Sequence, residues 1–213
     1  MKTRTRLFAL FCAAVLLAGA SGCASTADMA EVLQQPEGTQ IRTRYHLWYT
    51  DPDNVSALNI MQGKFLPAGT VIEPVGVRRG YYDIFGKVSL VDGAITFRTE
   101  AGEEFTVRYD ARLHMMPIEE FIRQLFTTDE PDTICAAVPK EDMDNVKLGK
   151  LTPGMHLESV LVVLGPPAKS RTTLLTNQSW LYWRTQDVVF RLIFKGDRIR
   201  QIASLDSLDA VQE

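Results

Sequence analysis

The sequence predicts an α+β protein of two small modules that follow an N-terminal segment of different character. Three observations lead to this prediction. Residues 7–20 form an uncharged apolar run, residues 41–127 are rich in strand and turn patterns, and residues 146–203 begin as a helix and continue as strands. The chain has 213 residues, of which 46% are apolar, so it is long enough for one or two domains and is not generally disordered.

The first 22 residues have the features of a secretion signal. Lys2, Arg4 and Arg6 precede the apolar run, and small residues follow it at 20–22. The run at 7–20 is too short for a membrane-spanning helix, which needs about 20 residues. We therefore expect residues 1–22 to be removed, which leaves 20 of the 23 basic residues against 26 acidic ones. This acidic balance argues against nucleic acid as a partner.

The residues around the expected cleavage point, LAGASGC at 17–23, resemble a bacterial lipobox, with Ala20 where Leu is commonest. The resemblance implies a diacylglycerol thioether and an N-acyl chain on Cys23, and therefore a stable membrane anchor. The alternative is an ordinary cleavage site with an incidental cysteine. Ala24 and Ser25 follow, rather than the Asp that favours inner-membrane retention in such lipoproteins. This implies an outer-membrane anchor facing the periplasm of a bacterial envelope.

Residues 23–40 are small and polar and predict a flexible tether that carries Cys23. In 41–127, strands are expected at 41–50, 70–77, 81–91, 94–98 and 104–109. A helix is expected after Pro117, because its apolar residues recur at helical spacing: Ile118, Phe121, Ile122, Leu125 and Phe126. This part predicts a small β-rich barrel or sandwich with one helix.

Residues 128–145 contain prolines and many acidic residues, and they predict an acidic linker between the two modules. In the second module, 146–203, a helix begins after His156 and ends at Gly165. Strands are expected at 169–173, 179–184, 188–194 and 198–202, which would form an antiparallel meander. Residues 204–213 form an acidic tail.

The second module resembles the SmpA/OmlA family, the BamE-like lipoprotein domain. The resemblance rests on turn and core residues: Gly154-Met155, Val160, Leu164-Gly165, Pro167, the strand WLY at 180–182, Val189-Phe190, Phe194 and Ile199. It implies a non-enzymatic accessory role in outer-membrane protein assembly or envelope integrity.

The sequence offers little chemistry for catalysis. His46, His114 and His156 occur in no metal-binding spacing, and neither a nucleophile elbow nor a phosphate-binding glycine loop is present. Cys135 stands among acidic residues, which raise the pKa of a thiol. We therefore expect no catalytic residues, no metal and no cofactor beyond the acyl chains on Cys23. A thiol-dependent envelope enzyme that uses Cys135 is the least favoured alternative.

The predicted strand 188–194 is apolar on both faces, and one helix covers only one of them. The second face is expected to meet either the first module or an envelope protein partner. For the second case, the expected contact residues are Trp180, Trp183, Val189 and Arg191. A further alternative is a ligand-binding module for peptidoglycan or lipid in the first module. The sequence leaves a small-molecule partner open.

Overall fold

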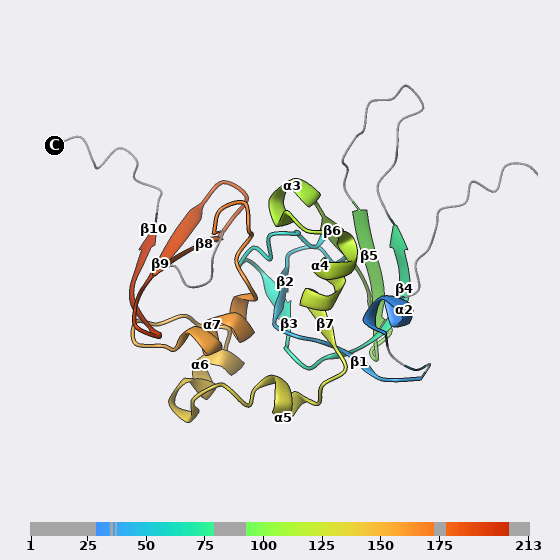
Figure 1. Cartoon of the computed structure of the whole chain (residues 1–213), viewed down its shortest axis with the longest axis horizontal. Coiled ribbons are helices and arrows are strands. Elements are labelled where there is room, and N and C mark those ends of the chain that lie inside the picture. Colours follow the sequence, from blue (N-terminus) through green and yellow to red (C-terminus); the bar gives the residue numbers. More distant parts are fainter. Residues whose placement is uncertain (1–28, 35, 37, 79–92, 173–177, 205–213) are drawn as a thin grey trace, which may run out of the picture.

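A computed structural model of the chain describes residues 29–34, 36, 38–78, 93–172 and 178–204. The signal segment 1–22, Cys23, the strand expected at 81–91 and most of the tail lie outside these residues. The part described combines helices with antiparallel sheets, which confirms the α+β prediction (Figure 1). None of its helices has the length and apolar character needed to cross a bilayer.

The first half of the molecule is built on a five-stranded antiparallel sheet with the order β6-β5-β4-β1-β7. Its strands, in that order, are Glu104–Tyr109, Gly93–Thr99, Val71–Arg78, Ile41–Thr43 and Phe126–Thr127. The described strands form no closed barrel, so the barrel alternative expected for 41–127 is wrong, while the sandwich alternative stays a prediction. The physical reason is that β1 and β7 are three and two residues long, too short to carry pairing around to β6.

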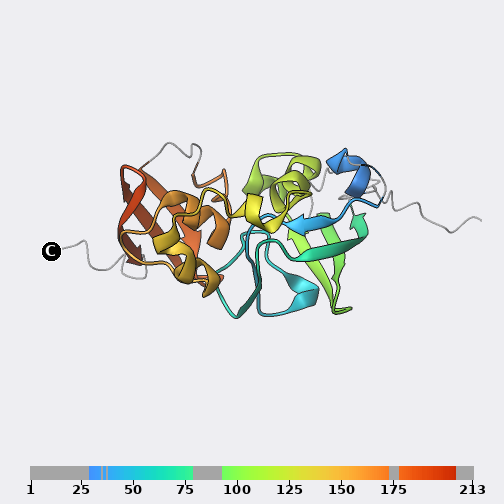
Figure 2. The same cartoon turned by 90° about the horizontal axis from the view of Figure 1, so that it is seen from below.

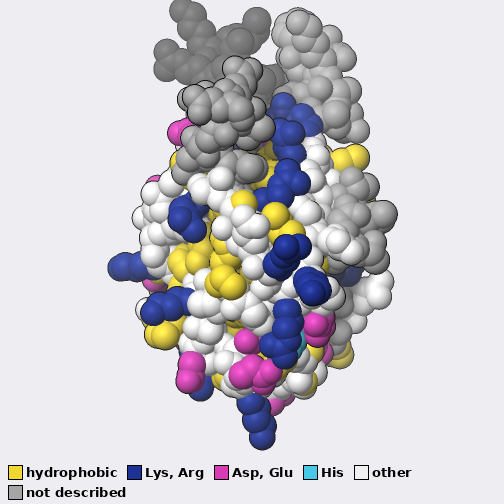
Figure 3. Space-filling view, turned by 90° about the vertical axis from the view of Figure 1, so that its left-hand side faces the viewer, with side chains coloured by type: hydrophobic (Ala, Val, Ile, Leu, Met, Phe, Trp, Pro, Cys, Tyr) yellow, Lys and Arg dark blue, Asp and Glu magenta, His cyan; other side chains and the backbone are white. Residues whose placement is uncertain are grey.

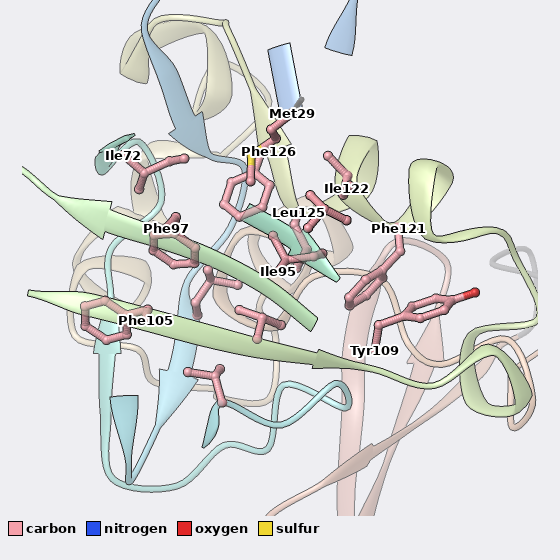
Figure 4. Packing of buried hydrophobic residues seen from close by; sticks show 14 of the residues in the cluster. Met29, Ile72, Ile95, Phe97, Phe105, Tyr109, Phe121, Ile122, Leu125 and Phe126 are labelled. Carbon is pink, nitrogen blue, oxygen red and sulfur yellow. The ribbon is translucent and has the colours of Figure 1, made fainter. Parts of the chain in front are cut away.

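Three helices accompany this sheet: α2 (Met29–Leu33), α3 (Ala111–His114) and α4 (Ile118–Leu125). The apolar stripe of α4 is buried as its spacing predicts, and it meets aromatic side chains of β5 and β6 (Figure 4). Helix α2 corrects the tether expected over 23–40 for its residues 29–33, because Met29 and Val32 are buried in the same core. A segment this short shows no periodicity, and only its tertiary contacts reveal it.

The expected linker, 128–145, is also folded. It contains α5 (Pro131–Ile134), a 3-10 turn (Lys140–Asp142) and most of α6 (Met143–Lys147). Val138 and Val146 are buried, and Cys135 and Met143 pack beside them. The acidic residues that suggested a linker alternate with these apolar ones, so the segment lies along the second core as a structured connection.

The second half consists of α7 (Leu157–Leu164) and a three-stranded meander with the order β10-β9-β8. Its strands are Ser179–Trp183 for β8, Val189–Lys195 for β9 and Arg198–Ser204 for β10. The strand expected at 169–173 is absent over its described part, 169–172. There the backbone turns, because Arg171 and Thr172 both donate to the carbonyl of Ala168.

A hairpin of β2 (Leu47–Tyr49) and β3 (Lys64–Leu66) lies between the two larger sheets (Figures 1 and 2). Leu47 and Leu66 belong to the first core. Trp48 belongs to the second core, and Phe65 packs against it. Alternate residues of one hairpin therefore serve two cores, so the halves share a wall.

Candidate functional site

The three-stranded sheet β8–β10 has one covered and one open face. Phe190, Leu192 and Phe194 of β9 are buried beneath α7, together with Trp180 and Tyr182 of β8. The residues between them point the other way, because side chains alternate along a strand. Strand pairing sets Leu181 opposite Arg191 and Trp183 opposite Val189. The β10 residues opposite β9 on this side are Gln201 and Ala203.

We call this second side the outer sheet face and define it by Ser179, Leu181, Trp183, Val189, Arg191, Ile193, Lys195, Gln201 and Ala203. Figure 3 views the molecule from this end and shows apolar side chains in the middle, lysine and arginine around them, and aspartate and glutamate mainly toward the lower edge. Leu181, Val189 and Ile193 are partly exposed. The face therefore offers a contact surface that is apolar at its centre and cationic at its margin.

Of the two tryptophans predicted as partner anchors, Trp180 lies on the covered face of the sheet, and Trp183 lies on the outer face but is largely buried. Trp180 is 1% exposed and packs against Phe194, with ring centroids 4.7 Å apart. Trp183 is on the outer side but is 9% exposed, because Ile60 and Ala168 cover it. Burial therefore excludes Trp180 as an accessible anchor on this surface, whereas Trp183 keeps only a small exposed part that borders the groove. Strand alternation separates the two faces but does not say which neighbour covers each residue.

Val189 and Arg191, the other two predicted contact residues, do line an open groove of about 490 Å³. Its other lining residues are Ser170, Arg171, Thr172, Ser179, Leu181 and Trp183. The hydroxyl oxygen of Ser170 is buried and has no hydrogen-bond partner among the described residues. Ordinary ligand sites have volumes of this size. The groove combines hydroxyl groups and two guanidinium groups with the apolar side chains of Leu181, Trp183 and Val189.

The cations in and beside the groove have no carboxylate partner in the part of the chain that the structure describes. Over the described ranges, no carboxylate oxygen lies within 4 Å of the charged nitrogens of Arg171, Arg191, Lys195 or Arg200. Arg191 donates instead to the Ser179 hydroxyl, at 3.1 Å. By contrast, Arg198 on the same sheet lies 3.4 Å from Glu141. Arg191 and Lys195 on the outer sheet face, with Arg171 in the adjoining groove, therefore place positive charge on this side of an acidic protein.

Sequence reasoning missed Arg171 and Ser170. They reach the groove through the turn after Ala168, and no local pattern connects that turn with β8 and β9. For Lys195 and Arg200 the sequence did contain a weak indication of a basic surface, because both lie in the β9–β10 hairpin, whose strands contain other basic residues.

The covered end of the outer sheet face belongs to the boundary between the two halves. There, three carbonyl groups at the C-terminus of α7 accept hydrogen bonds from the first half. Val162 O accepts from His46 N at 2.9 Å, Val163 O from Trp48 Nε1 at 2.9 Å, and Leu164 O from Asn59 Nδ2 at 2.8 Å. Helix C-terminal carbonyls have no partner within their own helix. The first half thus completes a helix of the second.

His46 reinforces this boundary. Its Nδ1 accepts from the Ala68 N–H and its Nε2 donates to the carbonyl of Val146, each at 2.8 Å. The ring is therefore neutral, because a proton on Nδ1 would face the Ala68 N–H. Burial lowers the pKa of His46, and the hydrogen bond to Val146 only partly opposes this.

Asp142, His156 and Ser159 form a buried cluster whose residue types suggest a catalytic triad. A single oxygen of Asp142 accepts from His156 N at 2.8 Å, from His156 Nδ1 at 2.8 Å and from the Ser159 hydroxyl at 2.7 Å. In a triad the serine would instead bond to the histidine, so this geometry differs from a nucleophile–base pair. His156 occupies the N-cap position of α7, but its side chain makes no capping hydrogen bond. The Asp142 carboxylate instead accepts hydrogen bonds at this end of the helix.

The charge of Asp142 is stabilised by this arrangement. Burial by itself would raise the pKa of the carboxyl group, but the hydrogen bonds from His156 and Ser159 outweigh it and lower the pKa. Cys135, in turn, is half-buried, and burial followed by the charge of Asp132 raises the pKa of its thiol. No group of three His, Cys, Asp or Glu side chains suited to a metal ion occurs in the described part of the chain.

Comparison of the chain with protein families, with curated proteins and with solved structures found no match to any of them.

Proposed function

We propose that the protein is a lipid-anchored, non-enzymatic binding protein of the bacterial envelope, whose outer sheet face docks a segment of an envelope protein. The single observation that carries the proposal is the open groove on that face, where the apolar side chains of Leu181 and Val189 lie beside two arginines that have no carboxylate partner among the described residues. Its chemistry selects a segment that is acidic and partly apolar.

The position of the groove supports docking rather than packing within the molecule. Ile60 of the first half packs with Ala168 against Trp183, and Leu181 and Val189 border this cluster. Both of these residues, like Ile193, nevertheless stay partly exposed. Apolar surface ringed by charge is typical of contact sites that bind and release a partner. The SmpA/OmlA resemblance supports an accessory role in outer-membrane protein assembly or envelope integrity, and it depends on core and turn residues at 154–199.

The docking proposal is tested by photocrosslinking in intact cells. A photoreactive phenylalanine at Ile193 is expected to yield one discrete protein adduct, and Arg171→Glu with Arg191→Glu is expected to remove it. The control is the same probe at Val75, which is 45% exposed on β4 of the other sheet. The proposal would be contradicted if the probes at 193 and 75 gave the same adducts in similar yield, or if the adduct at 193 formed equally well after the two arginines were replaced by glutamate.

The anchor is a separate part of the proposal and depends on the lipobox-like run at 17–23. We expect Cys23→Ala to abolish incorporation of a palmitate analogue and to release the protein from membranes. The control is Cys135→Ser, which should leave both properties unchanged. Label that persists in the Cys23→Ala protein would place the lipid elsewhere.

A further inference from the structure

We infer that the segment after β10, residues 205–213, binds in the groove of the outer sheet face and competes there with the partner segment. Its sequence is LDSLDAVQE, and it lies outside the described residues. The inference adds regulation to the proposed docking site. Only its second part, the competition with a partner segment, rests on the proposed function.

The strand order brings the start of this segment close to the groove. β10 ends at Ser204, which pairs with Phe190 of β9. Phe190 stands between Val189 and Arg191, both of which line the groove, and it pairs with Tyr182 of β8 on its other side. Two strand spacings amount to about 10 Å. An extended segment of this length reaches roughly 30 Å, so residues 205–213 span the distance easily.

The chemistry of the segment matches that of the groove. Asp206, Asp209 and Glu213 supply negative charge, while Leu205, Leu208 and Val211 supply apolar side chains between them. The groove is lined by Arg171 and Arg191 together with the apolar Leu181 and Val189, and neither arginine has a carboxylate within 4 Å among the described residues. Opposite charge orients the segment, and burial of its leucines adds affinity.

Tethering makes even a weak contact effective. A segment joined directly to the sheet has an effective concentration on the order of 1 mM at the groove. If it binds in trans with a Kd of about 100 µM, the tethered copy weakens any competitor roughly tenfold. A partner segment therefore binds the full chain about tenfold more weakly than it would bind an unoccupied groove, and in this way the tail sets the apparent affinity of the site.

The test uses a fluorescein-labelled peptide of sequence LDSLDAVQE and the full chain, with binding followed by anisotropy. The variant Asp206→Lys/Asp209→Lys keeps the chain length but impairs the tethered competitor. We expect it to bind the peptide at least fivefold more tightly than the wild-type chain, and more weakly as salt is added. Arg171→Ala and Arg191→Ala in that variant should lose binding, whereas Arg78→Ala, an exposed arginine on β4, should not.

Three outcomes would overturn the inference: equal peptide affinity of the two chains, no peptide binding to the variant, or binding that ignores Arg171 and Arg191. A separate binding experiment uses the same variant with phosphatidylcholine vesicles that contain an anionic phospholipid. If the variant binds these and not the peptide, a membrane surface occupies the groove instead. The two proposals can fail separately. If the photoreactive residue at Ile193 gives no protein adduct but the tail variant still binds the peptide more tightly than the wild-type chain, the docking proposal fails and the intramolecular contact is retained.

Discussion

Asp142 is the residue on which the start of α7 depends. It is 4% exposed and accepts three hydrogen bonds from His156 and Ser159 with one carboxylate oxygen. Asp142→Ala leaves these buried donors without a partner, and we expect a loss of about 3 kcal/mol in the free energy of unfolding. Urea denaturation measures it. Asp144→Ala, an exposed carboxylate two residues away, should cost less than about 0.5 kcal/mol.

Two buried histidines make the stability depend on pH. Burial lowers the pKa of His114 from 6.5 to about 4, against smaller opposing effects of the Ala57 carbonyl and Asp110, and burial also lowers that of His46. Between pH 6.5 and 4 the unfolded chain therefore binds protons that the folded chain does not. The free energy of unfolding should fall as pH falls through this window, by up to about 3 kcal/mol for His114.

The measurement is the free energy of unfolding by urea at intervals from pH 7 to pH 4. His114→Gln, which does not titrate, is expected to flatten the profile relative to the wild-type chain. The lowered pKa values of Asp110 and Asp142 start from 3.8, so these carboxyl groups act mainly below the window. A wild-type profile that is already flat between pH 6.5 and 4 would contradict the neutral buried state of both histidines.

At the scale of elements, Asn59 connects the β2–β3 hairpin to α7. Its amide nitrogen donates to His46 O at 2.9 Å and to Leu164 O at 2.8 Å, and its Oδ1 accepts from Trp48 N at 2.8 Å. Asn59→Ala leaves these buried backbone groups unpaired, so we expect a loss of about 3 kcal/mol. The matched control is Asn54→Ala, which removes an exposed bond to Arg108. Similar effects of the two substitutions in thermal unfolding would contradict this role.

The elements also show how far local pattern reaches. The stripe of α4 and the stop at Gly165 were readable from spacing, because both depend on residues within a few positions of one another. Gly165 has φ 70°, and the Tyr45 ring would lie 2.5 Å from an added Cβ. Glycine is therefore required at 165 both by the local backbone conformation and by the close approach of the distant Tyr45 ring. Helix α2 was not readable, since Met29 and Val32 matter only through a core made by distant strands.

At the scale of the whole molecule, we expect the two halves to unfold as one unit, because the β2–β3 hairpin contributes to both cores. We expect the fragment 140–213 alone to lack fixed tertiary packing, since it loses the cover of Trp48 and Ile60 and is too small to replace it. Near-UV circular dichroism and the dispersion of amide resonances measure this.

Coexpression of the fragment 1–139 with 140–213 is the control, and it should restore the packed state. An isolated fragment that melts cooperatively would show that the shared wall is dispensable. That result would return the two halves to the independent modules that the sequence suggested.

What the sequence determined by itself is what depends on neighbours in the chain: the α+β class, the amphipathic α4, the limits of α7, and Val189 and Arg191 as residues on one side of a strand. The tertiary structure alone decided which face of that strand stays open. It buried Trp180 and Trp183 and brought Arg171 to the groove. The physical reason is that periodicity sorts side chains into faces, whereas exposure depends on which distant segments pack against each face.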